Sequence, residues 1–119
     1  MKKTAKITIR IPEVLRKEVL QVIVDDNYGL RGKSRWVAEA IIDFLNKENF
    51  LDFVDIGSEM NGADLIAIES FYLSAEILDA IEKAMLKIRQ KYPMMEGIKS
   101  VIIRSSIIQR LLRPKHNPE

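Results

Sequence analysis

The chain has no cysteine and only one histidine among its 119 residues. Without cysteine it can form neither disulfides nor thiolate metal sites. The histidine, His116, lies in a C-terminal stretch that we expect to be frayed, so the converging groups that catalysis needs are missing. No spacing matches a metal-binding loop or a glycine-rich phosphate loop. We therefore expect no enzymatic activity, no metal site and no cofactor.

Long apolar runs are also missing. No stretch approaches the roughly 18 residues that a membrane-spanning helix needs. The beginning, MKKTAKITIRIP, lacks the apolar segment of a signal peptide. Hydrophobic residues make up 47% of the chain, which is enough for a packed interior, and charged residues make up 30%. We expect a folded, soluble, cytoplasmic protein with no membrane contact.

Basic residues are absent from the middle of the chain. Residues 49–74 carry five acids and no Lys or Arg, whereas residues 1–48 carry ten bases and seven acids. Residues 75–119 carry nine bases and five acids. Two basic blocks therefore flank an acidic joint. This pattern suits two contacts with a polyanion, although exposed charge is also typical of an ordinary solvated surface.

Residues 1–48 are expected to form a strand followed by two helices. Polar and β-branched apolar residues alternate from Lys6 to Ile11, as in a strand with one buried face. Pro12 ends this strand and suits the first turn of a helix. A glycine-rich turn follows, and Ser34 is a candidate N-cap for the second helix. The apolar stripe of that helix consists of Trp36, Val37, Ala40, Ile41, Phe44 and Leu45.

Residues 65–113 are expected to repeat this order, with a strand at 66–73. Ser74 is a candidate cap for a long helix and Ser100 for a final one. When Ser34 is aligned on Ser100, the isoleucine pairs of the two final helices coincide. We interpret the two halves as an internal duplication, with chance similarity of amphipathic segments as the alternative.

The interval between strand and final helix differs between the halves. It is 22 positions from Pro12 to Ser34 and 26 from Ser74 to Ser100. Four residues are about one helical turn. The two halves therefore differ in this interval by about one helical turn.

Residues 49–64 join the two halves, and residues 114–119 form the tail. The joint contains glycines and acids, but also Phe50, Phe53 and Ile56, which make it too apolar for a free tether. We expect it to pack on the domain as a short helical turn. The same three residues are the candidate surface for a protein partner.

A lone strand of six residues is not stable, so the two strands are expected to pair antiparallel within the chain. One face of this ribbon would then be buried against the four helices. The other face would present Lys6, Thr8 and Arg10 beside Ile68, Ser70 and Tyr72. A two-stranded ribbon fits the major groove of B-DNA, where Lys and Arg donate to guanine O6 and N7.

Two stretches resemble the ribbon-helix-helix superfamily of the Arc and methionine repressors. They are Lys6-Ile-Thr-Ile-Arg-Ile-Pro-Glu and Gly32-Lys-Ser-Arg-Trp-Val-Ala-Glu-Ala-Ile-Ile-Asp-Phe-Leu. The repeated order is similar to that of tandem members, such as the TraY-type accessory proteins of plasmid conjugation. The resemblance implies a mostly α fold with a two-stranded antiparallel ribbon, arranged as a pseudo-dimer in one chain.

The resemblance also implies sequence-specific binding to double-stranded DNA, as a transcriptional repressor or a plasmid-transfer accessory factor. The implied base-reading residues are Lys6, Thr8, Arg10, Ser70 and Tyr72. The implied phosphate-binding residues, at the starts of the final helices, are Lys33, Ser34, Arg35, Lys99 and Ser100. A helix N-terminus independently suits a phosphate, although a serine there can also be a simple cap.

Two features depart from the family pattern. Trp36 stands where many members have a small hydroxyl residue, and it is expected to anchor the core rather than to stack on a base. The second strand offers Ile68 and Tyr72 where basic residues would be expected. The alternative function is a protein-interaction module, such as an antitoxin or a recruiter, in which DNA binding is secondary or lost.

Overall fold

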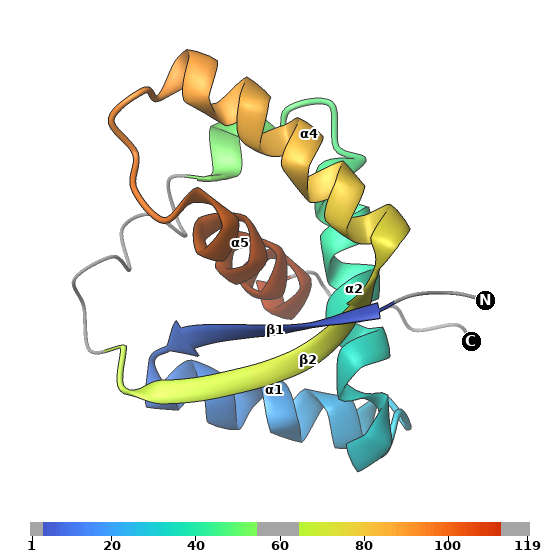
Figure 1. Cartoon of the computed structure of the whole chain (residues 1–119). Helices are drawn as coiled ribbons and strands as arrows, with labels where there is room; N and C mark the ends of the chain where they lie inside the picture. Colours follow the sequence, from blue (N-terminus) through green and yellow to red (C-terminus); the bar gives the residue numbers. More distant parts are fainter. Residues whose placement is uncertain (1–3, 55–64, 113–119) are drawn as a thin grey trace.

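The computed structural model describes residues 4–54 and 65–112. Within these ranges the chain is mostly helical, with four helices and one two-stranded antiparallel sheet (Figure 1). The elements are β1 (Thr4–Ile11), α1 (Glu13–Asp25), a 3-10 turn (Leu30–Gly32), α2 (Lys33–Leu45), a second 3-10 turn (Phe50–Phe53), β2 (Ala67–Ser74), α4 (Ala75–Lys91) and α5 (Ile98–Leu112). The expected order, a strand and two helices in each half, is confirmed. No helix in the described ranges is long and apolar enough to cross a bilayer.

The two strands lie side by side and alternate between a buried and an exposed face. Ile9 and Ile11 of β1 point inward, as do Phe71 and Leu73 of β2, and each is at most 3% exposed. β-Branched and aromatic side chains favour such a half-buried pleated surface. The period-two pattern read from the sequence is therefore confirmed for both strands.

The register of the sheet is centred on Thr8 and Ser70, which face each other. Pro12 is the N-cap residue of α1, and Ser74 is that of α4. Thr8 and Ser70 each lie four positions before these caps (12 − 8 and 74 − 70), so each faces its own counterpart. Two copies of one strand related by a two-fold axis would pair in this same register.

Both strands turn directly into helices. Pro12 has an extended backbone (φ −63°, ψ 146°), which ends β1 and starts α1. At the second corner, the Ser74 hydroxyl accepts a hydrogen bond from the Ile77 amide at 3.3 Å, as expected for a cap. The long helix predicted after Ser74 is confirmed: α4 has 17 residues and α1 has 13, a difference of about one turn.

The predicted caps of α2 and α5 are wrong. The 3-10 turn at Leu30–Gly32 runs directly into α2, so its N-cap residue is Gly32 and Ser34 lies inside the first turn. A side chain at Gly32 would meet the Tyr28 Cβ at 2.7 Å, which explains the glycine. α5 begins at Ile98, so Ser100 also lies inside its first turn.

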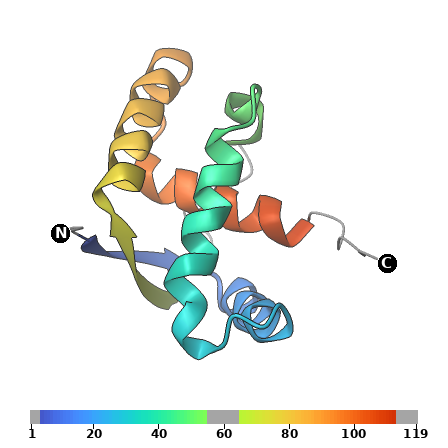
Figure 2. The ribbon, with the colours of Figure 1, turned by 90° about the vertical axis from the view of Figure 1, so that its right-hand side faces the viewer.

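The core is shared by the two halves, and α5 lies at its centre. β1, α1, α2 and α4 all contact α5, which crosses α2 (Figure 2). Eight consecutive residues, 101–108, are buried. The sequence predicted only an amphipathic stripe on this helix. Trp36 is fully buried, so its expected role as a core anchor is confirmed.

Arg110, near the end of α5, ties the second half to the first. Its guanidinium donates hydrogen bonds to the Trp36 carbonyl at 2.8 Å, the Tyr28 hydroxyl at 2.9 Å and a Glu39 carboxylate oxygen at 3.3 Å. It also lies over the Trp36 ring at 4.6 Å and the Tyr28 ring at 5.3 Å. The side chain is only 11% exposed, so these contacts are largely shielded from water.

The first part of the joint packs on the helices as the expected short turn. Phe50 is buried and meets the Phe44 ring edge-on, with 5.9 Å between ring centroids. Lys91 of α4 donates a hydrogen bond to an Asp52 carboxylate oxygen at 3.1 Å, and this bond raises the pKa of Lys91. This contact joins the described part of the connector to α4, the first helix of the second half.

Candidate nucleic-acid interface

The outer face of the ribbon carries all five residues that the sequence nominated for base reading. Lys6, Thr8 and Arg10 of β1 are exposed. Ser70 of β2 is half-buried, and Tyr72 is 56% exposed. No acidic side chain lies on this face among the described strand residues. The structure therefore brings the nominated residues together on one accessible surface.

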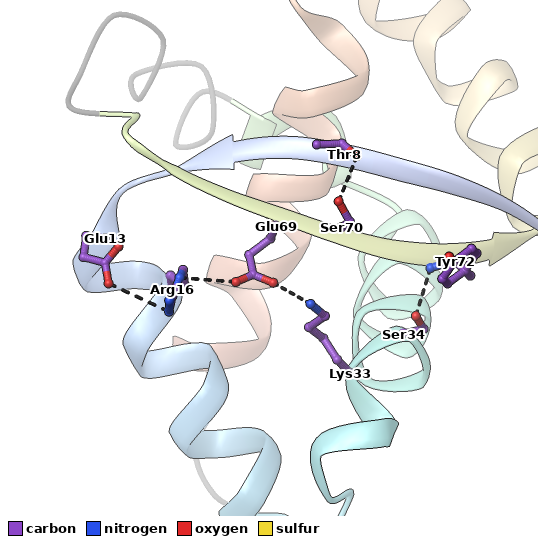
Figure 3. A network of polar contacts seen from close by, with 8 residues as sticks. All are labelled: Thr8, Glu13, Arg16, Lys33, Ser34, Glu69, Ser70 and Tyr72. Atoms are coloured by element: carbon purple, nitrogen blue, oxygen red, sulfur yellow. Dashed lines mark hydrogen bonds and ion pairs between the residues drawn. The ribbon is translucent and has the colours of Figure 1, made fainter.

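A hydroxyl pair occupies the centre of this face. The Thr8 and Ser70 hydroxyl oxygens are 2.9 Å apart and share a hydrogen bond (Figure 3). One hydroxyl donates within the pair, so the hydrogen of the other remains available to a ligand. The centre of the ribbon can thus both donate and accept.

Basic and apolar residues are divided between the two strands. Lys6 lies opposite Tyr72, and Arg10 lies opposite Ile68, which is 56% exposed. Both cations therefore come from β1, while β2 places an aromatic and an aliphatic side chain across from them. On either side of the central hydroxyl pair, the exposed faces of β1 and β2 therefore differ in chemistry.

Lys33, which was expected to bind phosphate, forms an ion pair with Glu69 of β2. Its ammonium lies 2.6 Å from one carboxylate oxygen of Glu69, and the Arg16 guanidinium lies 3.4 Å from the other (Figure 3). The Glu69 side chain is 16% exposed. This cluster was not predicted from the sequence, where its signal is a lone acid in an otherwise uncharged strand.

Ser34 fastens the start of α2 to the edge of the ribbon. Its hydroxyl oxygen accepts a hydrogen bond from the backbone amide of Tyr72 at 2.9 Å (Figure 3). The Ser34 hydroxyl hydrogen can still be donated to a ligand. Arg35, the next residue, is exposed, and its guanidinium lies over the Tyr28 ring at 4.4 Å.

The start of α5 faces the opposite edge of the ribbon. Ser100 lines a hollow of about 370 Å³ together with Gly97, Arg10 and Arg104. Gly97 has a φ of 60°, which is costly for any residue with a Cβ. The ammonium of the nearby Lys99 lies 4.0 Å from a carboxylate oxygen of Glu82.

Arg104 is a buried cation that the sequence analysis did not nominate. It is 2% exposed and donates a hydrogen bond to the backbone carbonyl of Arg10 at 3.3 Å. Burial lowers the pKa of its guanidinium, although such a group stays protonated at ordinary pH. Its signal in the sequence is a single arginine between pairs of isoleucines and serines.

The candidate partner surface on the connector is mostly not exposed. Phe50 is 6% exposed and Phe53 is half-buried, while Ile56 lies outside the described residues. In the part of the chain that the structure describes, no three His, Asp or Glu side chains converge as a metal site would require.

A scan of protein-family models and searches of curated proteins and of solved structures find no match to this chain.

Proposed function

We propose that this is a tandem ribbon-helix-helix protein, without catalytic activity, that binds double-stranded DNA sequence-specifically by inserting the β1–β2 ribbon into the major groove. It would act as a transcriptional repressor or a plasmid-transfer accessory factor. The observation that carries the proposal is the outer face of the ribbon, which has two basic side chains, a central pair of hydroxyls and, among the described strand residues, no acid.

The dimensions of the ribbon support this function. Lys6 and Arg10 are four residues apart on one strand, which is about 14 Å at a rise of roughly 3.4 Å per residue. The same length of B-DNA holds about four base pairs, and the major groove is about 12 Å wide. The two cations of β1 would therefore reach base edges about four base pairs apart.

The positions of α2 and α5 support phosphate contacts on both sides of the groove. α2 begins beside β2, to which Ser34 is bonded, and α5 begins beside β1, where Ser100 shares a hollow with Arg10. A helix N-terminus offers unsatisfied amides and a partial positive charge, which favour a phosphate. Two such termini flanking a basic ribbon would fix its position on the duplex.

The symmetric register supports the tandem pseudo-dimer. Thr8 faces its counterpart Ser70, and α5 packs on α2, the corresponding helix of the other half. A duplication that retained the symmetric pairing of two identical chains would produce this arrangement. The two halves would then share one ribbon and one core.

The proposal is tested by selecting fragments of the native genome or plasmid on the purified protein. We expect a small set of duplex sequences to be enriched, located at promoters or at a transfer origin. Arg10→Ala should reduce the enrichment, because it loses about 1–3 kcal/mol on the specific duplex and less on other fragments. Equal retention of all fragments by the unmodified protein would contradict sequence-specific recognition.

A further inference from the structure

Glu69 occupies an unusual place for a carboxylate. It belongs to the inward-facing set of β2, and its counterpart in β1, one position before the central Thr8, is Ile7. Its side chain is only 16% exposed. A carboxylate that loses most of its water is costly unless cations replace that water.

Two cations from different helices replace the water. Arg16 approaches from α1 at 3.4 Å and Lys33 from α2 at 2.6 Å. Both side chains are about one-third exposed, so each borders on solvent (34% for Arg16 and 30% for Lys33). Lys33 is the first residue of α2, immediately before Ser34 at the ribbon edge. Its ammonium is therefore beside the place where a phosphate would lie, but it is bound to a carboxylate of the protein itself.

We infer that Glu69 limits the affinity for DNA, because its carboxylate pairs with the Lys33 ammonium, which would otherwise contact a DNA phosphate. This inference rests on the proposed function. The carboxylate neutralises Lys33, one of the cations at the start of α2. When the duplex binds, Lys33 therefore neutralises no phosphate and releases no counterion from the DNA. β1 has Ile7 at the position that Glu69 has in β2, so β1 offers no matching acid to Lys99 at the start of α5, and the restraint acts at the start of α2 only.

Glu69→Gln is expected to release Lys33. Each phosphate contact adds about 0.9 to the slope of log affinity against log salt, which is roughly eightfold in affinity at 0.1 M salt. The variant should therefore bind a random duplex about eightfold more tightly, with a slope steeper by about one. Lys33→Ala should leave the slope of the otherwise unmodified protein unchanged. The double variant should not show the gain.

Glu18→Gln is the matched control. Glu18 is an exposed acid on α1, the helix that carries Arg16, so its removal changes the net charge by the same amount without touching Lys33. It should alter neither the slope nor the affinity by more than about twofold at 0.1 M salt. Circular dichroism would show whether each variant is folded. If Glu69→Gln does not fold, the salt slope of Lys33→Ala still tests the inference, because a slope lowered by about one would show that Lys33 already contacts a phosphate.

A measurement without DNA tests the ion pair itself. Acetylation of the free protein, followed by mass spectrometry, should modify Lys33 more slowly than the exposed Lys17, and Glu69→Gln should remove the difference. Equal rates in the unmodified protein would overturn the inference. So would a slope that Glu69→Gln leaves unchanged, or one that Lys33→Ala lowers by about one. If no variant binds duplex DNA, the proposed function fails and the inference fails with it.

Discussion

An asymmetric DNA site is the most specific prediction that follows from the proposed function. In a symmetric ribbon both strands present the same side chains and recognise the same bases, so the DNA site is palindromic. Here Lys6 and Arg10 favour guanine acceptors, whereas their counterparts Ile68 and Tyr72 can offer at most apolar contact with a thymine methyl. Guanine dependence is therefore expected at one end of the site and weak dependence at the other.

The double substitution Ile68→Lys and Tyr72→Arg makes the two strands equivalent in this respect. A good side-chain contact to guanine is worth about 1–3 kcal/mol of discrimination. The double variant should therefore gain at least about 1–3 kcal/mol on a palindrome built from the guanine-rich half, roughly five- to 150-fold in affinity. On the natural site the gain should be smaller, because the required guanines are missing from the weak end.

The same change has a cost in the free protein. Each new cation would face Arg10 or Lys6 directly across the ribbon, and like charges in such pairs are destabilising by about 0.2–1 kcal/mol. A slightly lower unfolding midpoint in low salt should accompany the tighter binding. Titrations of both proteins on the natural site and on the palindrome, with single base substitutions, test the reasoning. Equal penalties at symmetry-related positions of the natural site would refute it.

Three further outcomes are expected. Arg10→Ala should cost about 1–3 kcal/mol of binding free energy on a specific duplex and less on a random one, whereas Ser34→Ala should weaken binding to both equally. Equal losses on both duplexes for Arg10→Ala would contradict its role as a base reader. Arg110→Met removes three hydrogen bonds and two ring contacts, so urea unfolding should show a loss of about 3 kcal/mol, and an unchanged midpoint would contradict this. A fragment of residues 1–48 should dimerise in light scattering, because β1 then needs a second β1, and a folded monomer would count against pairing of the two halves.

The strands and their exposed faces could be predicted from the sequence because the signal is local. Alternation with period two fixes which side chains share a face, so Thr8 and Arg10 were placed correctly without knowledge of the partner strand. The long helix after β2 was predictable for a similar reason, since apolar residues recur at helical spacing from Ile77 onward. The cap at Ser74 was predictable because it depends only on residues three positions apart.

The surroundings of the phosphate candidates could not be predicted. Ser34 and Ser100 resemble caps, but the turns before them carry the chain into the helix earlier than the serines suggest. The pairing of Lys33 with Glu69 joins residues 36 positions apart, and only the tertiary packing of α2 on β2 brings them together. The burial of α5 on all sides likewise depends on helices from both halves.

Since β1 and β2 belong to one chain, the ribbon does not have to be assembled from separate molecules before it can bind. A protein whose DNA-binding ribbon needs two chains occupies few sites when it is scarce. At low concentration its dimer falls with the square of the total protein concentration. For this chain the occupancy of a site would rise in direct proportion to the amount of protein. Its response to expression would be graded from the first few copies in a cell, without the threshold that association imposes.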